Sequence, residues 1–227
     1  MTLRGGAVLA FWHDLAPGGE AEFVQWHNLE HIPERVGIEG FLRGRRYEAA
    51  GEGPRYFVLY ETDNLAVLDG AAYLERLQNP TPWTQRALPL FRNSKRTACR
   101  TILTLGAGVG GALATLDFGP APGRETDLRA WLVGSAMPAA TKRAGVVGVH
   151  LCEADAATTG AKSRTAEGQL QDRTDVMARW VLMVEAVTAD VAGDAFEEPL
   201  GAEALDAHGA APGRTLALYR LAYCLDR

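Results

Sequence analysis

The side chains best suited to chemistry lie in one short segment, residues 26–35, with the sequence WHNLEHIPER. His27 and His31 are four residues apart, so a helix places both imidazoles on one face. Histidine has an unperturbed pKa of about 6.5 and therefore takes up or releases a proton near neutral pH. We predict that His31 and His27 are catalytic, with His31 favoured by its place at the end of the helix.

Three further side chains are catalytic candidates. Glu30 supplies a carboxylate, although it points about 100° around the helix from His31 and also fits a solvated surface position. Arg35 has a fork of N–H donors that matches an anion, although a surface pair with Glu34 explains it equally well. Tyr47, on the strand that follows, offers a hydroxyl that can donate to a substrate oxygen.

Aromatic side chains near this segment predict an apolar wall for a substrate. The candidate binding residues are Phe11, Trp12, Trp26, Phe57 and Trp83. A pocket between a sheet and its helices, lined by such residues, admits an apolar or aromatic molecule. Trp83 follows two prolines, and simple packing is its alternative interpretation.

Residues 27–31 also spell H-x-x-E-H, the inverted form of a zinc-protease motif. A catalytic zinc needs a third protein ligand, and Pro33 is expected to end this helix almost at once. The other histidines, His13, His150 and His208, suggest no partner by their spacing. We therefore predict no metal.

Residues 106–111 match G-x-G-x-x-G, the pattern of a dinucleotide-binding turn. That function needs a helix starting at the glycines, so that its N-terminus meets the pyrophosphate. Only residues 112–118 follow before a run of Gly and Pro, and they are typical of a strand. The glycines therefore predict a linker, and we expect no cofactor.

The composition indicates a globular protein with a full core. The chain has 227 residues, 47% of them hydrophobic, and a net charge of −5. Such apolar content excludes a disordered chain, and the acidic balance argues against nucleic acid. The longest uncharged stretch, 101–116, is too short and too glycine-rich to span a membrane. With three widely spaced cysteines and no signal peptide, we expect a cytoplasmic protein with reduced thiols.

The chain contains an internal duplication at an offset of 105 residues. Residues 6–49 and 111–154 share 11 identities in 44 ungapped positions, and these include glycines, prolines and Trp26/Trp131. The positions of His27, His31 and Arg35 hold only aliphatic residues in the second copy, namely Leu132, Ala136 and Ala140. We predict that the first copy carries the chemistry and that the second acts as a wall.

Each copy reads as strand, helix, strand, strand, helix, strand, which predicts an α+β fold. In the first copy the expected strands are 6–14, 41–50, 55–62 and 97–105, with helices at 20–34 and 64–78. In the second they are 112–118, 145–153, 179–187 and 215–225, with helices at 124–140 and 190–207. Residues 155–175 are expected to be a polar, mobile loop. Arg43 and Arg45 alternate along one strand and should share a half-solvated face.

We therefore expect two ferredoxin-like βαββαβ units, a first repeat at residues 1–107 and a second repeat at 108–227. Each four-stranded sheet has helices on one face and would leave the other face apolar. The two sheets are expected to pack together as a fused α+β barrel that buries both faces.

The unit resembles the dimeric α+β barrel superfamily, which includes EthD-like proteins, antibiotic-biosynthesis monooxygenases, muconolactone isomerases and polyketide cyclases. The segments that carry the resemblance are 26–35 (WHNLEHIPER), 40–47 (GFLRGRRY) and 80–84 (PTPWT). The resemblance implies an uncharacterised, tandem-fused branch of that superfamily. It permits cofactor-independent oxygenation, and it permits haem, which some duplicated members bind through a histidine.

We expect a small-molecule enzyme without a metal, in which His31 moves a proton beside a carbonyl while Tyr47 or Arg35 holds the oxyanion. Isomerisation, cyclisation, lyase chemistry and oxygenation all suit this set. A non-catalytic binding or assembly protein of the same fold is the alternative, and haem binding ranks below it. A homodimer is compatible with the sequence.

Overall fold

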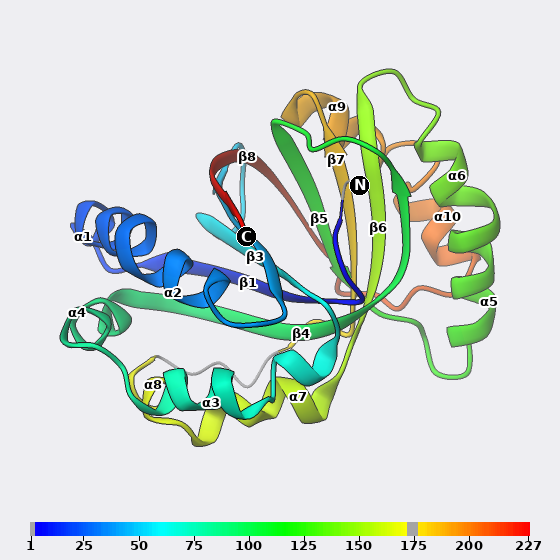
Figure 1. Ribbon diagram of the computed structural model, residues 1–227. Helices are drawn as coiled ribbons and strands as arrows, with labels where there is room; N and C mark the ends of the chain where they lie inside the picture. Colours follow the sequence, from blue (N-terminus) through cyan, green and yellow to red (C-terminus); the bar gives the residue numbers. More distant parts are fainter. Residues whose placement is uncertain (1–2, 172–176) are drawn as a thin grey trace.

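The structure is a computed structural model that describes residues 3–171 and 177–227. Within these residues eight strands form a closed barrel in the order β1-β3-β2-β8-β5-β7-β6-β4, and all neighbours are antiparallel (Figure 1). The strands are β1 (Ala7–Leu15), β2 (Phe41–Ala49), β3 (Tyr56–Thr62), β4 (Phe91–Gly106), β5 (Ala112–Phe118), β6 (Val146–Ala154), β7 (Trp180–Ala186) and β8 (Thr215–Asp226).

The two halves of the barrel repeat the same strand arrangement. Ala7 on β1 pairs with Thr62 on β3, and its counterpart Ala112 on β5 pairs with Ala186 on β7. The pairs β2–β8 and β4–β6 join the halves. The predicted α+β class and fused barrel of two ferredoxin-like units are confirmed.

Strand alternation separates two apolar layers, because successive side chains of a strand point to opposite faces. On β1, Trp12 belongs to the core inside the barrel, together with residues such as Phe57. Its neighbour Phe11 faces outward and packs under the helices of the first repeat. Any pocket between sheet and helices is therefore lined by the outward set.

An ion network fills one end of the barrel interior. The Arg45 guanidinium lies 2.8 Å from Glu61 Oε1 of the first repeat and 2.8 Å from Glu185 Oε1 of the second. Arg43 also pairs with Glu61, at 2.7 Å. Arg43 and Arg45 share one face as predicted, but the expectation of a half-solvated face is wrong, since both are buried. Closing the sheet into a barrel converted that face into interior.

This network keeps the carboxylate of Glu185 ionised. Burial alone would raise the pKa of Glu185, but the hydrogen bond with His150 and the charge of Arg45 lower it to about 2. His150 Nε2 lies 3.3 Å from Glu185 Oε1. The end of the barrel is thus held by charges contributed from both repeats.

The main helix of the first repeat runs through α1 (Glu20–Trp26), the π-helical segment η1 (His27–His31) and α2 (Ile32–Val36). The expectation that Pro33 ends the helix is wrong. The N–H of Ile32 bonds to the carbonyl of His27, five residues back, and such a wide turn accommodates the proline that follows, whose missing N–H would leave a gap in an α-helical ladder.

The second repeat has the same three segments at the offset of 105, namely α5 (Glu125–Trp131), η4 (Leu132–Ala136) and α6 (Met137–Ala140). Its π-helical turn precedes Pro138, as η1 precedes Pro33. Both repeats therefore keep the unusual turn, although only the first has histidines in it.

The other two predicted helices are shorter than expected. In place of the helix 64–78, Asn64 caps a 3₁₀ turn, η2 (Leu65–Val67), and the helix α3 (Ala71–Gln78) follows. The expected helix 190–207 is divided into α9 (Ala189–Asp194) and α10 (Ala202–Ala207). A further helix, α4 (Pro82–Ala87), and the turn η3 (Leu88–Leu90) precede β4. None of the helices in the described parts of the chain has the length and apolar character needed to cross a membrane.

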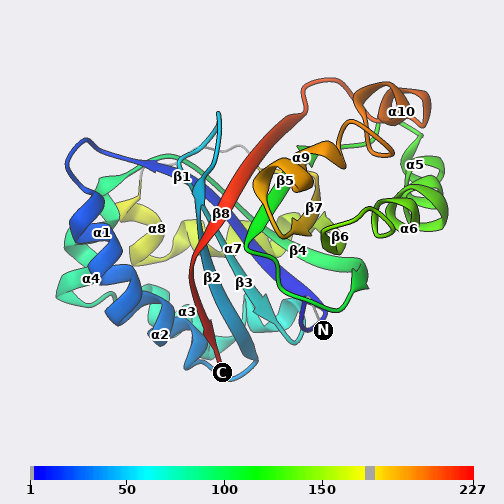
Figure 2. The same cartoon turned by 90° about the horizontal axis from the view of Figure 1, so that it is seen from above.

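The segment expected to be a polar loop, 155–175, folds into α7 (Ala156–Ala161), the turn η5 (Lys162–Arg164) and α8 (Ala166–Leu170), while residues 172–176 lie outside the described residues. Its small polar residues cap these helices: the N–H of Thr158 donates to Asp155 Oδ1 at 2.9 Å, and that of Gly168 to Thr165 Oγ1 at 3.3 Å. This insertion (residues 155–171) lies beside α3 of the first repeat (Figures 1 and 2).

Arg45→Ala should destabilise the protein strongly, because it leaves Glu61 and Glu185 buried without their shared cation. Removing one partner of a buried ion pair costs about 3–5 kcal/mol. Urea unfolding at pH 7 measures this loss. Arg220→Ala, on the exposed side of β8, is the matched control and should change the free energy of unfolding by less than about 0.5 kcal/mol. Equal losses in the two variants would contradict the assignment.

Candidate functional site

A small cavity lies between the outer face of the first-repeat sheet and the elements that cover it. It leaves about 30 Å³ for the centres of water-sized molecules, which is room for about two waters. The lining residues come from β1, β3, β4, the helix around η1, α3 and the insertion. They are Leu9, Phe11, His27, His31, Arg35, Val58, Tyr60, Tyr73, Phe91, Arg96, Lys162, Glu167 and Gln171.

The π-helical turn η1 brings both predicted catalytic histidines to this cavity. The rings of His27 and His31 have centroids 5.5 Å apart and planes 22° apart. Trp26 packs against both imidazoles, with ring centroids 4.2 Å from His31 and 5.7 Å from His27. Both imidazoles are thereby fixed in orientation by neighbouring rings.

Burial holds both histidines in the neutral form. Desolvation lowers the pKa of His27 well below 6.5, and the charge of Arg46 lowers it further. Desolvation and the charge of Arg35 do the same for His31. Arg46 Nη1 lies 3.5 Å from His27 Nδ1, and since a guanidinium only donates, Nδ1 accepts and the ring proton of His27 sits on Nε2.

Three buried polar atoms at the cavity have no hydrogen-bond partner among the described residues. One is Glu167 Oε2, which lies 3.6 Å from Lys162 Nζ. The other two are His31 Nδ1 and Tyr60 Oη. Desolvation raises the pKa of Tyr60 above its usual value, so the phenol remains protonated at neutral pH. A buried polar atom without a partner is costly, and a bound ligand would supply the missing bond at both positions.

Arg35 is buried and lines the same cavity. Its Nη1 donates to Glu34 at 2.9 Å, which is the pair considered from the sequence. Its Nη2 donates to Glu167 of the insertion, so the guanidinium is part of an interior contact between the repeats and is not on the surface.

Glu30 lies between helices and does not line the cavity. Its Oε1 accepts hydrogen bonds from Thr81 Oγ1 at 2.5 Å, from Thr84 Oγ1 at 3.2 Å and from Trp26 Nε1 at 3.2 Å. Trp83 lies near this contact and donates from Nε1 to Glu22 at 2.8 Å. Glu30 thus joins η1 to the α4 region, and Trp83 joins α4 to α1. Their predicted roles in catalysis and binding stay predictions that the geometry does not link to the cavity.

Strand alternation directs Tyr47, Trp12 and Phe57 into the barrel interior. The expectation that they share a pocket with the histidines does not match the structure, because they lie on the opposite face of the sheet. Of the predicted aromatic wall, Phe11 lines the cavity and Trp26 packs behind His31.

Sequence reasoning missed Tyr60, Arg96, Lys162 and Glu167. For Tyr60 a signal existed, because aligning the third strands at their shared RxxxxxE pattern (residues 55–61 and 179–185) pairs it with the aliphatic Val184. Arg96 required the strand register. It lies opposite Phe11 on β1, whereas the counterpart of Phe11, Leu116, lies opposite Leu216. Lys162 and Glu167 lie in an insertion that has no counterpart to compare.

At the matching position of the second repeat, aliphatic side chains replace the polar ones. Leu132, Ala136, Ala140 and Val184 occupy the places of His27, His31, Arg35 and Tyr60 there. All four belong to the buried hydrophobic core of that repeat. The structure therefore shows one repeat packed with aliphatic side chains where the other retains titratable ones.

The zinc hypothesis needs a cluster of ligands that the geometry does not provide. Across residues 3–171 and 177–227, no three His, Cys, Asp or Glu side chains gather so that they could hold a metal ion. Glu30 of the H-x-x-E-H motif bonds instead to threonines of the α4 region.

Known proteins resemble this chain in structure but not in sequence, since no family model and no curated protein sequence matches it. An anthrone oxidase-like protein superimposes with a TM-score of 0.64 at 11% identity, covering 97% of this chain and 92% of its own. The chain has the fold of a dimeric α+β barrel. A candidate monooxygenase from Fusobacterium nucleatum gives 0.59 at 9% identity, covering 99% and 96%.

A haem-binding protein from Thermus thermophilus also shares this dimeric α+β barrel fold, with a TM-score of 0.53 at 12% identity, covering 98% of this chain and 93% of its own. Haem does not fit the described residues of the cavity at His31. His31 is flanked by Trp26 and His27, and the cavity of about 30 Å³ is far below the several hundred Å³ of a typical cofactor pocket. We therefore derive no step through haem.

The lowered pKa values of His27, which is buried, and of half-buried His31 predict a loss of stability in mild acid. Above a pH of about 6.5 both histidines are neutral in the folded and in the unfolded protein, so they do not lower the free energy of unfolding. Below that pH the unfolded chain binds protons that the folded chain excludes, and the free energy of unfolding falls. Each histidine should lower the free energy of unfolding by up to about 1.4 kcal/mol per pH unit. Urea unfolding between pH 7.5 and 5 tests this in wild type and in the double variant His27→Leu/His31→Ala, which carries the residues of the second repeat.

We expect a flatter pH dependence in the double variant, with a residual slope from His13, whose pKa desolvation lowers to about 3. His208→Asn, outside the cavity, is the control and should leave the slope unchanged. A wild-type slope retained in full by the double variant would contradict the burial argument.

Proposed function

We propose that this chain is a small-molecule enzyme of the oxygenase type, acting in the cavity beneath η1. The observation that carries the proposal is the pairing at one cavity of a neutral imidazole, His31, with a protonated phenol, Tyr60. Both have a buried atom that lacks a partner among the described residues. A guanidinium, Arg35, lines the same space.

In this proposal His31 is the general base. It removes a proton from a carbon or hydroxyl made acidic by a neighbouring aromatic ketone. Tyr60 donates a hydrogen bond to the oxygen on which negative charge develops, and Arg35 adds its positive charge. His27, oriented by Arg46, supports His31 through ring stacking, so it is a positioning residue.

The co-substrate in this proposal is dioxygen. Removal of the proton by His31 leaves an electron-rich carbanion or enolate, which dioxygen oxidises. For an activated methylene, the overall change is a CH₂ group plus O₂ giving a C=O group plus H₂O, which balances without any further reductant. The printed descriptions of the structural neighbours, an anthrone oxidase-like protein and a candidate monooxygenase, support this reaction class.

A non-catalytic ligand-binding protein of the same fold is the second candidate. Glu167 closes the cavity against Arg35 in this structure, and the strongly lowered pKa of His31 makes it a weak base until a ligand binds. Isomerase or lyase chemistry shares the deprotonation step and differs in consuming no dioxygen.

His31→Ala should reduce kcat by about 10²–10⁴-fold, the usual contribution of a general base. A panel of aromatic ketones with acidic C–H groups would be screened for turnover, followed by an oxygen electrode and by absorbance. His208→Ala, a histidine outside the cavity, is the matched control and should retain full activity. Unchanged turnover in His31→Ala would refute the role, and turnover without oxygen uptake would favour the isomerase or lyase class.

Tyr60→Phe separates catalysis from folding. Its hydroxyl has no partner in the described structure, so removing it should leave the free energy of unfolding unchanged or slightly higher. The same change should lower kcat by about 10²–10³-fold, as loss of an oxyanion donor does. Tyr56→Phe, on the same face of β3 but outside the cavity lining, is the control and should leave kcat unchanged. Full activity in Tyr60→Phe would remove the phenol from the mechanism.

A further inference from the structure

The cavity of the first repeat contains a carboxylate that belongs to the second. Glu167, on α8 of the insertion, is 1% exposed. It pairs with Arg35, and its Oε2 lies 3.6 Å from Lys162 Nζ. Among the described residues that line the cavity, Glu167 is the one acidic side chain, whereas Arg35, Arg96 and Lys162 are basic.

This charge balance favours a bound anion. Buried cations are costly unless an anion pairs with them, and the second repeat avoids the cost by having Ala140 in place of Arg35. Glu167 supplies the anion in the present arrangement. Without its carboxylate, the cavity would hold an excess of positive charge beside the aromatic walls of Phe11 and Phe91.

The position of Glu167 is also the space that a ligand needs. The remaining free volume holds only water-sized molecules. An aromatic molecule that reaches Tyr60 and His31 must therefore displace side chains of the insertion. Among these side chains, Glu167 is the one that forms an ion pair with Arg35.

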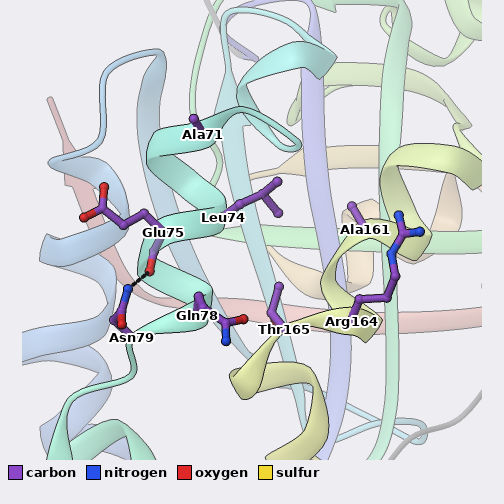
Figure 3. Close-up of a pocket in the computed structure, with 8 residues that line it drawn as sticks. All are labelled: Ala71, Leu74, Glu75, Gln78, Asn79, Ala161, Arg164 and Thr165. Carbon is purple, nitrogen blue, oxygen red and sulfur yellow. Dashed lines mark hydrogen bonds between the residues drawn. The ribbon is translucent and has the colours of Figure 1, made fainter.

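The two ends of the insertion are held differently. Thr159 on α7 is fixed to β4, since its Oγ1 accepts from the N–H of Ala98 at 3.0 Å and its carbonyl from Arg96 Nη1 at 3.4 Å. On α8 the N–H of Ala166 donates to Gln78 Oε1 of α3 at 3.3 Å. An open groove separates α3 from the insertion (Figure 3) and is lined by Ala71, Leu74, Glu75, Gln78, Asn79, Ala161, Arg164 and Thr165.

We propose that Glu167 occupies the position of the ligand's own anionic group, and that the cavity takes an aromatic molecule bearing a carboxylate or an ionised hydroxyl, which displaces Glu167 from Arg35. α8 moves aside along the groove, while α7 stays on β4. This inference rests on the proposed function for the location of the site, and it adds the charge of the ligand and the contact that must open.

Binding of benzoate and of its neutral isostere benzamide tests the proposal, measured by calorimetry on wild type and on Glu167→Gln. The variant keeps the shape of the side chain but removes the carboxylate that pairs with Arg35 inside the cavity, while Glu34 remains paired from outside it. We expect benzoate to bind at least 10-fold more tightly to Glu167→Gln than to wild type, with benzamide changed by less than 3-fold. Adding Arg35→Met should abolish the gain.

Glu34→Gln is the matched control, because Glu34 pairs with the same guanidinium from the half-buried side outside the cavity. An equal gain in benzoate affinity for Glu34→Gln would overturn the proposal, since it would reflect net charge alone. No gain in Glu167→Gln would also overturn it.

Hydrogen exchange of the wild type gives a second readout that does not depend on a variant folding. Saturating benzoate should speed amide exchange in residues 166–170 and leave 156–161 unchanged, and benzamide should do neither; unchanged exchange with benzoate would overturn the proposal. These measurements involve no turnover. A failed His31→Ala experiment would refute the proposed function alone, and a failed benzoate experiment would refute this inference alone.

Discussion

Closure of the barrel around one guanidinium determines where chemistry is possible in this protein. Arg45 lies between Glu61 of the first repeat and Glu185 of the second, and interior strand positions on either side are filled by the barrel core. Interior side chains such as Trp12 and Ala217 line one small pocket, whereas the outward face of the first-repeat sheet, under its helices, lines the cavity at η1. The π-helical turn η1 then sets which helix side chains reach that face, since its wide turn places His27 and His31 together over the sheet.

The duplication separates what the fold requires from what a ligand requires. Both repeats keep the π-helical turn, the proline after it and the strand pairing, so these features serve the architecture. The second repeat replaces the polar cavity by aliphatic packing. Because the second repeat adopts the same backbone plan with aliphatic residues at these positions, the plan itself does not require the histidines, phenol and guanidinium of the first repeat.

The sequence predicts much of the fold, because period-two alternation and turn residues are local signals. Alternation places Arg43 and Arg45 on one face, yet it cannot tell interior from solvent, which depends on barrel closure. The same ambiguity led to Tyr47 being chosen over Tyr60 as the oxyanion donor. Comparison of the repeats identifies His27, His31 and Arg35 as unusual. It cannot identify Glu167, because the insertion has no counterpart in the first repeat and packs on that repeat through tertiary contacts.

The Arg35–Glu167 contact is better explained by ligand chemistry than by stability. A buried ion pair gains little net free energy over apolar residues of similar size, because desolvating two charges offsets their attraction. Ala140, at the place of Arg35 in the second repeat, shows that this helix position needs no charge. The pair also joins two repeats that the barrel has already joined through two antiparallel strand pairings, β2–β8 and β4–β6. A costly contact that the fold does not need, placed beside an unpartnered phenol and imidazole, is accounted for if another anion takes its place.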